Sequence, residues 1–507
     1  MKSKIVFLGC GSVSKCCIYY LPNFFKNIDY NQVFIVDKDL NSFNFPTIKS
    51  SIKKGANIFH YKITRKNIGH LLDEIIKVKK HDIIIDLTTN TPTYKILTEC
   101  RVRELLYINT SIEDDYKLSV NKQCPMDDSI FIQHMNILSI KSKMNDAGIT
   151  DSVTSIIEFG MNPGLISVFV KQGIIDITKM IFEERIKNKT NKDEYYKDLL
   201  RYYKKRDHKN LARLLDIKAI HCSEIDTQLP KKTPKEKFIN TWSCVGLITE
   251  GIESAEIQIG THEKILPFKE SNVSEIIPQL IITKTSGKDI KVKSLVPLNI
   301  NKNGSVEFTD IEGRCIHHGE GMSLNRYLGS FEYSPTMHYA YKLNPITDKL
   351  LDELNQEQLI NITKSSSKWK VLNMYDDNLE GYDNVGALFI LDKNPITGSS
   401  EPFSFWTGSI LNTDYTKKIL NDKYFGPTVV QVMAGVLSGV KWMIKNKKSG
   451  IVFGEDIDDR YIIKLAKKYL GKYYSGPVDP KYKLKHTTLN KLIVQGADET
   501  HTNVSKL

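Results

Sequence analysis

The stretch KIVFLGCGSVSKCCIYYL, residues 4–21, decides how the first part of the chain folds. Its apolar run ends at Gly9, which is typical of a strand buried in a parallel sheet. The turn GCGSVS follows and opens a helical pattern. Gly9 permits a tight turn, and Gly11 lets the backbone approach a pyrophosphate at the helix N-terminus. We therefore predict a dinucleotide site that includes Gly9, Gly11, Ser12, Val13 and Ser14.

Two residues refine this prediction. Ser14 stands where the usual fingerprint has a third glycine, and it is still small enough for close packing of helix on strand. Asp37 ends the next apolar stretch, QVFIVD. A carboxylate there accepts hydrogen bonds from the adenosine ribose hydroxyls and repels a 2′-phosphate, so NAD is favoured over NADP as the cofactor.

Strand-like and helix-like stretches alternate through the first 150 residues. NIFHYKI, DIIIDLTTN and LLYINTSIE are typical of strands, whereas NIGHLLDEIIKVKK and TPTYKILTECRV are typical of helices. Such alternation predicts a doubly wound parallel sheet, whose ligands bind beyond the carboxyl ends of the strands. The residues expected at that edge, on the cofactor side, are Thr89, Asn90, Asn109, Thr110 and Glu113.

Composition narrows the class of protein. The chain of 507 residues is too long for one compact core, so two or three domains are expected. The net charge is +12, but the lysines are spread along the whole chain, so we do not expect nucleic acid as a partner. No stretch reaches about 18 uncharged apolar residues, so no membrane span is expected.

The cysteines and the C-terminus bear on the compartment. The eight cysteines are scattered and form no C-x-x-C pair, which favours a reducing compartment, and we expect a cytoplasmic protein. The last three residues, Ser505, Lys506 and Leu507, form a peroxisomal address if the source is a eukaryote. A peroxisomal location is therefore the lesser alternative.

Acidic, histidine and aromatic residues concentrate between residues 220 and 340, in AIHCSEIDTQ, FINTWSCVGLITEGIESAEIQIGTHEK and GRCIHHGEGMSLNRYL. Each glutamate taken singly is typical of a surface, and each histidine of a structural role, but their concentration indicates a polar site. No zinc signature such as H-E-x-x-H is present, so no metal is predicted. Upstream, the turn at residues 162–164 has two interpretations, an ordinary turn or closure over a nicotinamide.

Several stretches resemble homospermidine synthase of the bacterial type. The likeness is carried by GCGSVS, LYINTSIE, MNPGLISVFVKQ, EIDTQ, NTWSCVGLITEG, AEIQIGTHE, HHGE, MHYAYKLNP, WTGS and GIVFGEDID. These stretches occur in the family's order and cover most of the chain. The family belongs to a larger group that is similar in fold to saccharopine dehydrogenase.

The resemblance implies an α/β fold with an N-terminal Rossmann-type doubly wound parallel sheet and a second α/β (α+β) catalytic domain. C-terminal helices are expected to pack back toward the first domain. We assign NAD binding to residues 1–150, and substrate binding, catalysis and dimerisation to residues 151–425. Residues 426–507 are expected to form the returning helical segment and a polar tail. A homodimer is implied as well.

The resemblance also implies a redox-neutral synthesis of a polyamine from small diamine substrates. One putrescine is oxidised to an imine with NAD as the hydride acceptor, and ammonia leaves. A second putrescine joins as a Schiff base, and the stored hydride reduces it to homospermidine. Putrescine with spermidine, releasing diaminopropane, is a variant of the same reaction. NAD is then tightly bound and recycled.

The residues matched to the family's site are Glu113, Asn162, Glu224, Trp242, Glu250, His318 and Glu320. The three carboxylates at 113, 224 and 250 are expected to bind ammonium groups and handle protons, with Glu224 as the first choice of base. Trp242 is expected to hold a cation by cation–π attraction, worth roughly 0.5–2 kcal/mol.

The remaining matched residues have supporting roles by the same resemblance. His318 is expected near the site, and Glu320 is expected to bind substrate or to lie behind a group that does. Asn162 is expected to position the nicotinamide and substrate. Asn90 departs from the family, which has an aspartate at that position, and this change can alter substrate affinity or cofactor contacts.

Two other functions stay open at this stage. A dehydrogenase of the saccharopine or carboxynorspermidine type, with net NAD(P)H turnover, needs arginines to bind a substrate carboxylate, whereas the matched stretches offer glutamates and tryptophan. A non-catalytic NAD-binding or nucleic-acid-binding protein is the second alternative. Binding of nucleic acid is supported mainly by the basic, tyrosine-rich stretch at residues 184–214. That stretch is more typical of a solvated helix with tyrosines facing the core.

Overall fold

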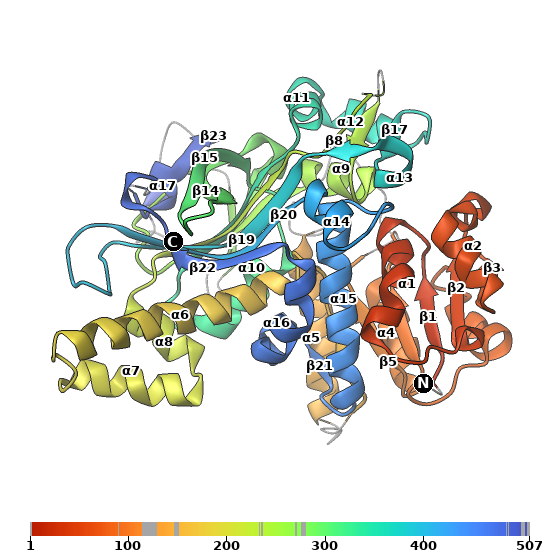
Figure 1. The fold of residues 1–507 in the computed structure, drawn as a ribbon, viewed down its shortest axis with the longest axis horizontal. Helices are drawn as coiled ribbons and strands as arrows, with labels where there is room; N and C mark the ends of the chain where they lie inside the picture. The colour runs from red at the N-terminus through yellow and green to blue at the C-terminus, as the bar shows by residue number, and fades with distance from the viewer. Residues whose placement is uncertain are drawn as a thin grey trace.

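The computed structural model in Figure 1 describes residues 3–89, 91–113, 129–146, 152–232, 234, 237–268, 271–274, 280–482, 484, 486–497 and 502–503. Two features singled out in the sequence, Asn90 and residues 505–507, lie outside the described residues. The described chain forms two large β-sheets, with helices packed on them and between them (Figure 1).

The first sheet has seven strands in the order β21-β6-β5-β4-β1-β2-β3. Each described pair of neighbours is parallel. The strands are β1 (Ile5–Leu8), β2 (Val33–Asp37), β3 (Asn57–His60), β4 (Ile83–Asp86), β5 (Leu106–Asn109), β6 (Ser155–Ile156) and β21 (Ile451–Val452). The chain adds β2 and β3 on one side of β1 and then returns to add β4 on the other. The strand order thus reverses between β1 and β4, where doubly wound sheets bind ligands.

Helices cover this sheet because apolar residues recur at helical spacing between the strands. The elements are α1 (Ser12–Phe24), η1 (Tyr30–Gln32), η2 (Leu40–Asn44), α2 (Pro46–Lys53), α3 (Ile68–His70), the π-helical turn η3 (Leu71–Ile76), α4 (Thr93–Val102) and α5 (Ile130–Asp146). Cys16 and Cys17 on α1 are fully buried packing residues.

The second sheet has eleven strands and is mixed. Its main path runs β12-β13-β10-β16-β7-β19-β20-β22, and β14 pairs with β15 and β23 beside it. The pair β16–β7 is parallel. The strands are β7 (Ala219–Asp226), β10 (Ser254–Gln258), β12 (Ser271–Ser274), β13 (Leu280–Ser286), β14 (Lys291–Ile300), β15 (Val306–Arg314), β16 (Thr336–Lys342), β19 (Tyr382–Leu391), β20 (Phe403–Asn412), β22 (Lys472–Pro477) and β23 (Ile493–Gln495).

Helices and short strands surround the second sheet. The helices are α6 (Leu165–Lys187), α7 (Glu194–Lys205), α8 (His208–Leu215), α9 (Cys244–Ile252), α10 (Gly319–Leu328), α11 (Pro345–Glu353), α12 (Gln356–Thr363), α13 (Met374–Asp377), α14 (Thr413–Lys418), α16 (Asp459–Ala466) and α17 (Leu489–Leu492), with turns η4 (Gly287–Asp289), η5 (Gly454–Asp456), η6 (Lys467–Tyr469) and η7 (Pro480–Tyr482). Three two-stranded sheets pair β8 (Leu229–Pro230) with β18 (Leu379–Glu380), β9 (Phe238–Asn240) with β17 (Trp369–Val371), and β11 (Ile265–Leu266) with β24 (Thr502–Asn503).

The C-terminal part of the chain joins the two sheets. Helix α15 (Pro427–Lys445) packs against α1 and lies between the halves of the molecule (Figure 1). By length and composition alone this helix could cross a membrane. However, 83% of its most apolar stretch of 18 residues is buried inside the protein. Strand β21 then joins the first sheet and β22 the second. The predicted fold class, including C-terminal helices that return to the first domain, is confirmed.

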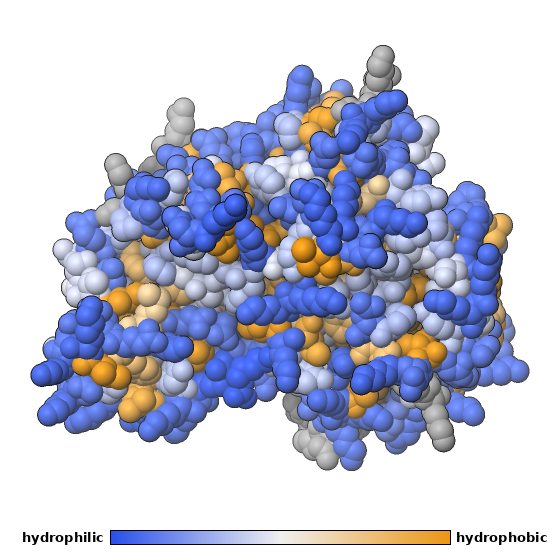
Figure 2. Space-filling model, viewed as in Figure 1, coloured by the Kyte–Doolittle hydropathy of each residue, from blue (hydrophilic) through white to orange (hydrophobic). Residues whose placement is uncertain are grey.

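The basic stretch of the sequence forms the α7–α8 hairpin, which projects from the end of α6 (Figure 1). Tyr195, Tyr196, Tyr202 and Tyr203 on α7 pack against the apolar core, as the helical pattern predicts. Hydrophilic side chains dominate the outer face of this hairpin in Figure 2. The hairpin is therefore an amphipathic helix pair with its tyrosines turned inward.

A candidate active site between the two sheets

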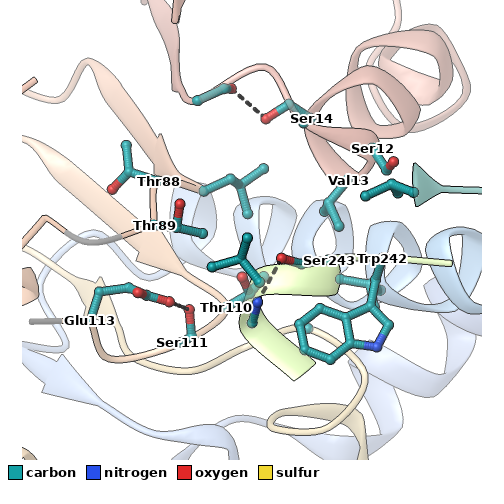
Figure 3. Close-up of a pocket in the computed structure, with 18 of the residues that line it drawn as sticks. Ser12, Val13, Ser14, Thr88, Thr89, Thr110, Ser111, Glu113, Trp242 and Ser243 are labelled. Carbon is teal, nitrogen blue, oxygen red and sulfur yellow. Dashed lines mark hydrogen bonds between the residues drawn. The ribbon is translucent and has the colours of Figure 1, made fainter. Parts of the chain in front are cut away.

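A cavity of about 860 Å³ lies where the carboxyl edge of the first sheet meets the second domain (Figure 3). Both domains line it. The predicted residues on its wall are Gly9, Gly11, Ser12, Val13, Ser14, Asp37, Thr89, Thr110, Glu113, Asn162, Glu224, Trp242, Glu250 and His318. Asn109 and Glu320 are described but do not line the cavity.

The glycine-rich turn has the form that a dinucleotide requires. Gly9 has a φ of +89°, and a Cβ added there would lie 2.5 Å from the carbonyl oxygen of Leu87. A Cβ added to Gly11 would meet nothing within 4 Å, so this side of the turn is open to a ligand. Gly11 precedes α1 and offers no side-chain cap, so the first N–H groups of the helix are available to a phosphate.

Ser14 strengthens the turn. Its hydroxyl donates a hydrogen bond of 2.6 Å to the carbonyl of Gly9, and the dashed line in Figure 3 marks this contact. The side chain is fully buried between α1 and the strand. The serine therefore keeps the close packing of a third glycine and adds a bond that fixes the turn.

Asp37 stands at the end of β2, beside the turn. Its two carboxylate oxygens accept hydrogen bonds from the backbone N–H groups of Cys10, at 2.5 Å, and Asp39, at 2.7 Å. These bonds hold the carboxylate in place and leave lone pairs for further donors. The turn and Asp37 together fit an adenosine dinucleotide with a free ribose 2′-hydroxyl.

Asn109 has a structural position that the sequence did not indicate. It is 2% exposed, its side-chain amide donates to the carbonyl of Ser111 at 2.6 Å, and its Oδ1 accepts from the N–H of Glu158 at 2.8 Å. The neighbouring Thr110 lines the cavity instead. Side chains at the end of a strand alternate in direction, so only one of two neighbours faces the ligand.

Glu113 follows on the same edge and does line the cavity. The hydroxyl of Ser111 donates to its carboxylate at 2.9 Å (Figure 3), and its backbone N–H donates to the hydroxyl of Thr93 at 2.8 Å. Its position is thus set by the loop after β5 and by the start of α4.

Glu224 lies on β7 at the centre of the second sheet. The side-chain amide of Asn162 donates to its carboxyl group at 2.7 Å. The hydroxyl of Tyr339, on the neighbouring strand β16, also hydrogen-bonds to Glu224 and to Asn162. Burial, with the charges of Asp383 and Asp226, raises the pKa of Glu224 well above its ordinary value. The raised pKa makes the Glu224 carboxylate a stronger proton acceptor than an ordinary glutamate.

Trp242 comes from the segment between β9 and α9, next to Ser243, whose hydroxyl accepts from the N–H of Gly246 and caps α9. Figure 3 shows the indole extending along the cavity wall. A Cβ added to Gly246 would lie 2.6 Å from the indole ring. A glycine at this position lets the ring lie close against the first turn of α9.

Glu250 and His318 complete the wall in the second domain. Burial raises the pKa of Glu250 to about 8 and lowers the pKa of His318 to about 3. The His318 ring stands edge-on to Tyr339, with ring centres 4.0 Å apart. At pH 7 the lowered pKa keeps the His318 imidazole neutral, and the raised pKa lets Glu250 hold a proton.

Glu320 lies behind the wall. It is 4% exposed, and burial raises its pKa well above the ordinary value, with the charges of Glu158, Glu250 and Glu455 adding to the effect. No hydrogen-bond partner is described for either carboxylate oxygen. Its predicted substrate contact stays a prediction, and the structure gives it a position one layer from the cavity.

The comparisons with known proteins agree with this architecture. Residues 5–150 match the saccharopine dehydrogenase NADP binding domain, and residues 160–473 match the saccharopine dehydrogenase C-terminal domain. The chain belongs to the saccharopine dehydrogenase family.

Named relatives cover nearly the whole of this family member. Homospermidine synthase from Blastochloris viridis is 26% identical over 478 residues, which are 92% of this chain and 89% of the relative. Homospermidine synthase from Mesorhizobium japonicum is 26% identical over 483 residues, or 92% and 88%. A crystal structure of homospermidine synthase from Legionella pneumophila in complex with NAD aligns with a TM-score of 0.70 at 25% identity, covering 94% of this chain and 91% of that one.

The cavity of this saccharopine dehydrogenase family member carries an acidic wall. Asp37, Glu113, Glu224 and Glu250 line it, and no arginine is found among its described lining residues. Its lysines, Lys15, Lys38 and Lys62, come from the first domain. Within the described part of the chain, no group of three or more His, Cys, Asp or Glu is arranged to hold a metal ion.

Sequence reasoning missed Asp383, an acidic neighbour of Glu224 in this family member, whereas Asp226 lies in the stretch AIHCSEIDTQ that it singled out. Asp226 and Asp383 face each other across β7 and β19, and they are 0% and 1% exposed. With Glu224 they form a buried carboxyl cluster, in which burial raises the pKa of Asp226 to about 6 and that of Asp383 well above its ordinary value. An aspartate within the apolar strand YDNVGALFIL was the signal for Asp383, but only strand pairing brings it to Glu224.

Proposed function

We propose that the protein is an NAD-dependent homospermidine synthase that joins two diamines in a redox-neutral reaction. The observation that carries this proposal is the composition of the cavity wall. A dinucleotide-type turn faces Glu113, Glu224, Glu250 and Trp242, with no arginine among the described lining residues. Carboxylates and an aromatic face are what a diammonium substrate needs, whereas a substrate carboxylate needs arginine. The names of the relatives support the same activity.

The cofactor in this proposal is NAD. The turn at Gly9 and Gly11, the uncapped start of α1 and the carboxylate of Asp37 are the residues that would hold it. Bound there, NAD supplies the acceptor and later the donor of one hydride. Asp37 disfavours a 2′-phosphate, which supports NAD over NADP.

The chain's own residues handle charge and protons. A diamine is a dication at neutral pH, and its reacting amine must lose a proton before a hydride can leave the adjacent carbon. Glu224 is the proposed base, because it is buried, bonded to Asn162 and next to further carboxyl groups. Glu250 and Glu113 hold ammonium groups, and Trp242 offers its indole face to the amine or iminium.

The apolar part of the cavity wall matters for the imine. An imine hydrolyses in water, so the intermediate must stay in a pocket that excludes solvent until the second amine adds. Tyr339, Tyr341 and Trp369 provide apolar faces on the cavity wall, and Tyr339 also hydrogen-bonds to Glu224. The same walls strengthen every charge interaction with the substrate.

The decisive experiment incubates the purified protein with putrescine and a catalytic amount of NAD. Homospermidine and ammonia are measured by mass spectrometry and an ammonia assay, and NADH by absorbance. Product formed without accumulation of NADH supports the proposal. Continuous NADH production indicates a dehydrogenase with net turnover of the cofactor. If the protein binds NAD but forms neither homospermidine nor NADH, it is a non-catalytic NAD-binding protein.

A dehydrogenase of the saccharopine type is the alternative that the family's name raises, although the named relatives do not favour it. It predicts net NAD(P)H turnover with an amino acid or keto acid as substrate. The acidic wall of the cavity opposes a substrate carboxylate by like-charge repulsion. Turnover with a carboxylated substrate, and none with putrescine, would favour this candidate.

We also propose a homodimer in the cytoplasm, on the grounds of the family resemblance and the scattered cysteines. Light scattering on the purified protein tests the dimer. A fluorescent fusion at the N-terminus, imaged in cells of the source organism, tests the compartment.

A further inference from the structure

Glu158 is a buried acidic residue to which the proposed reaction gives no role. It follows β6 at the carboxyl edge of the first sheet and is 3% exposed. Its φ is +55°, in the left-handed region that residues other than glycine seldom adopt. Its N–H donates to Oδ1 of Asn109 at 2.8 Å. Unusual backbone of this kind persists where the surroundings hold it, often at functional sites.

The Glu158 carboxylate is fixed from one side by α5. One oxygen, Oε2, lies 2.7 Å from Nε2 of His134, and both side chains are buried. The His134 ring stacks on Phe453, with ring centres 5.3 Å apart. No hydrogen-bond partner is described for the other oxygen, Oε1. A buried carboxyl group needs further compensation, and this points to its neighbour on the opposite side.

That neighbour is the first residue of α10. A Cβ added to Gly319 would lie 2.0 Å from Oε2 of Glu158 and 2.4 Å from Oε1, so any larger residue would displace the carboxyl group. The residue before it, His318, makes no side-chain cap hydrogen bond. A carboxylate beside a helix N-terminus is stabilised by the helix dipole and the first N–H groups. Glu158 thus places a carboxyl group from the edge of the first sheet against the start of α10, beside Glu320 in the first turn of that helix.

The position of α10 sets the position of His318. The His318 ring lines the cavity and rests against Tyr339, which hydrogen-bonds to Glu224. On its other side, Glu158 is tied through Asn109 to the strand whose next residue, Thr110, lines the cavity. A single buried residue therefore connects the nucleotide edge of the first sheet, through its backbone N–H, to the helix that follows His318, through its side chain.

We propose that Glu158 is a positioning residue that holds the start of α10, and with it His318, in place relative to the nucleotide-binding edge. Its effect on turnover rests on the proposed function, because the residue acts through His318 and does not reach the cavity itself. Its effect on the position of α10 does not depend on the reaction.

The kinetic test is a double-mutant cycle of Glu158→Gln with His318→Ala. Glu158→Gln alone keeps the shape of the side chain, and we expect kcat to fall by roughly 10–100-fold, the effect of a small displacement of the His318 side chain in the cavity wall. The Kd for NAD and the KM for putrescine are expected to change less than about threefold. In the His318→Ala background, Glu158→Gln is expected to change kcat less than about twofold. If Glu158→Gln lowers kcat as much in the His318→Ala background as in the wild type, the inference is overturned.

A matched control separates this role from simple burial. Glu263 is 4% exposed and accepts hydrogen bonds from the Thr336 hydroxyl and the N–H of Leu489, both at 2.9 Å, away from the cavity. Glu263→Gln is expected to lower the melting temperature without changing kcat. Gly319→Ala gives a second variant, in which the new methyl group displaces the Glu158 carboxyl group and should reproduce the loss in kcat.

Hydrogen exchange gives a readout that needs no turnover. We expect the amides of residues 319–323 to exchange faster in Glu158→Gln than in the wild type, and to be unchanged in Glu263→Gln. If exchange is faster in Glu158→Gln but the wild-type protein makes no homospermidine, the positioning role holds and the proposed function fails. Unchanged exchange together with unchanged kcat would overturn the positioning role.

Discussion

The side-chain amide of Asn162 donates a hydrogen bond of 2.7 Å to the carboxyl group of Glu224, across the boundary between the two sheets. Asn162 belongs to the turn after β6 of the first sheet, and Glu224 to the central strand β7 of the second sheet. This bond fixes the proposed base relative to the nucleotide-binding edge. A proton and a hydride can leave the same substrate only if both acceptors are held in one geometry.

Glu224→Gln tests the proposed base. The amide keeps the size of the side chain but cannot take a proton, so we expect kcat to fall by roughly 10²–10⁴-fold. Binding of NAD is expected to stay within about twofold, because Glu224 lies on the substrate side of the cavity. Single-turnover absorbance at the NADH wavelength measures the step directly. A rate near that of the wild type would remove Glu224 as the base.

Trp242→Ala tests the aromatic wall. Loss of cation–π attraction and of buried apolar area should lower kcat/KM for putrescine at least about tenfold, with NAD still bound. Trp242→Phe should recover part of the loss, since phenylalanine keeps a weaker aromatic face. Steady-state kinetics on both variants, with NAD binding followed by protein fluorescence, is the measurement. Equal activity of all three proteins would place Trp242 outside the substrate site.

Glu250 predicts a proton linkage to substrate binding. Burial raises its pKa to about 8, so at pH 7 the empty site holds a proton that a bound ammonium group expels. We expect putrescine binding to the NAD-loaded protein to release about one proton that Glu250→Gln does not release. Calorimetry in two buffers of different ionisation enthalpy measures this number. Heats that are independent of the buffer in the wild type would contradict it.

The same pKa predicts a pH dependence of stability in the absence of substrate. Between the ordinary pKa of a glutamate and about 8, native Glu250 keeps a proton that the unfolded chain has lost. Its contribution to the unfolding free energy is therefore fully present at low pH and declines as the pH rises through this window. Denaturant unfolding at several pH values should show a shallower decline for Glu250→Gln. If the unfolding free energy declines equally with pH in the two proteins, the decline arises from groups other than Glu250.

Asp37→Ser tests cofactor choice. Loss of a charged acceptor for the ribose hydroxyls should weaken NAD binding by roughly 10–100-fold and narrow the preference over NADP. Asp39→Asn is the matched control, because its side chain bonds to the N–H of Asn41 and does not line the cavity. Fluorescence titration with both nucleotides measures the two affinities. An unchanged ratio of the affinities would show that Asp37 does not select the cofactor.

Local signals in the sequence predicted the nucleotide-binding half. The strand, the tight turn at Gly9, the open backbone at Gly11 and the carboxylate of Asp37 are adjacent in sequence or follow from strand–helix alternation, so their geometry is set by short-range rules. The same rules misplaced Asn109, because they say which residues end a strand but not which of two neighbours faces the ligand.

Tertiary structure decided the rest of the site. Asp383 reaches Glu224 only because β19 pairs with β7, and Glu158 meets Gly319 only because α10 begins where β6 ends. These contacts join residues more than 150 positions apart, and no periodicity encodes a pairing of that range. The sequence by itself determined the nucleotide turn and the strand–helix order, because both depend on neighbouring residues. The acidic cluster and the placement of His318 depend on how two sheets pack, which only the folded chain settles.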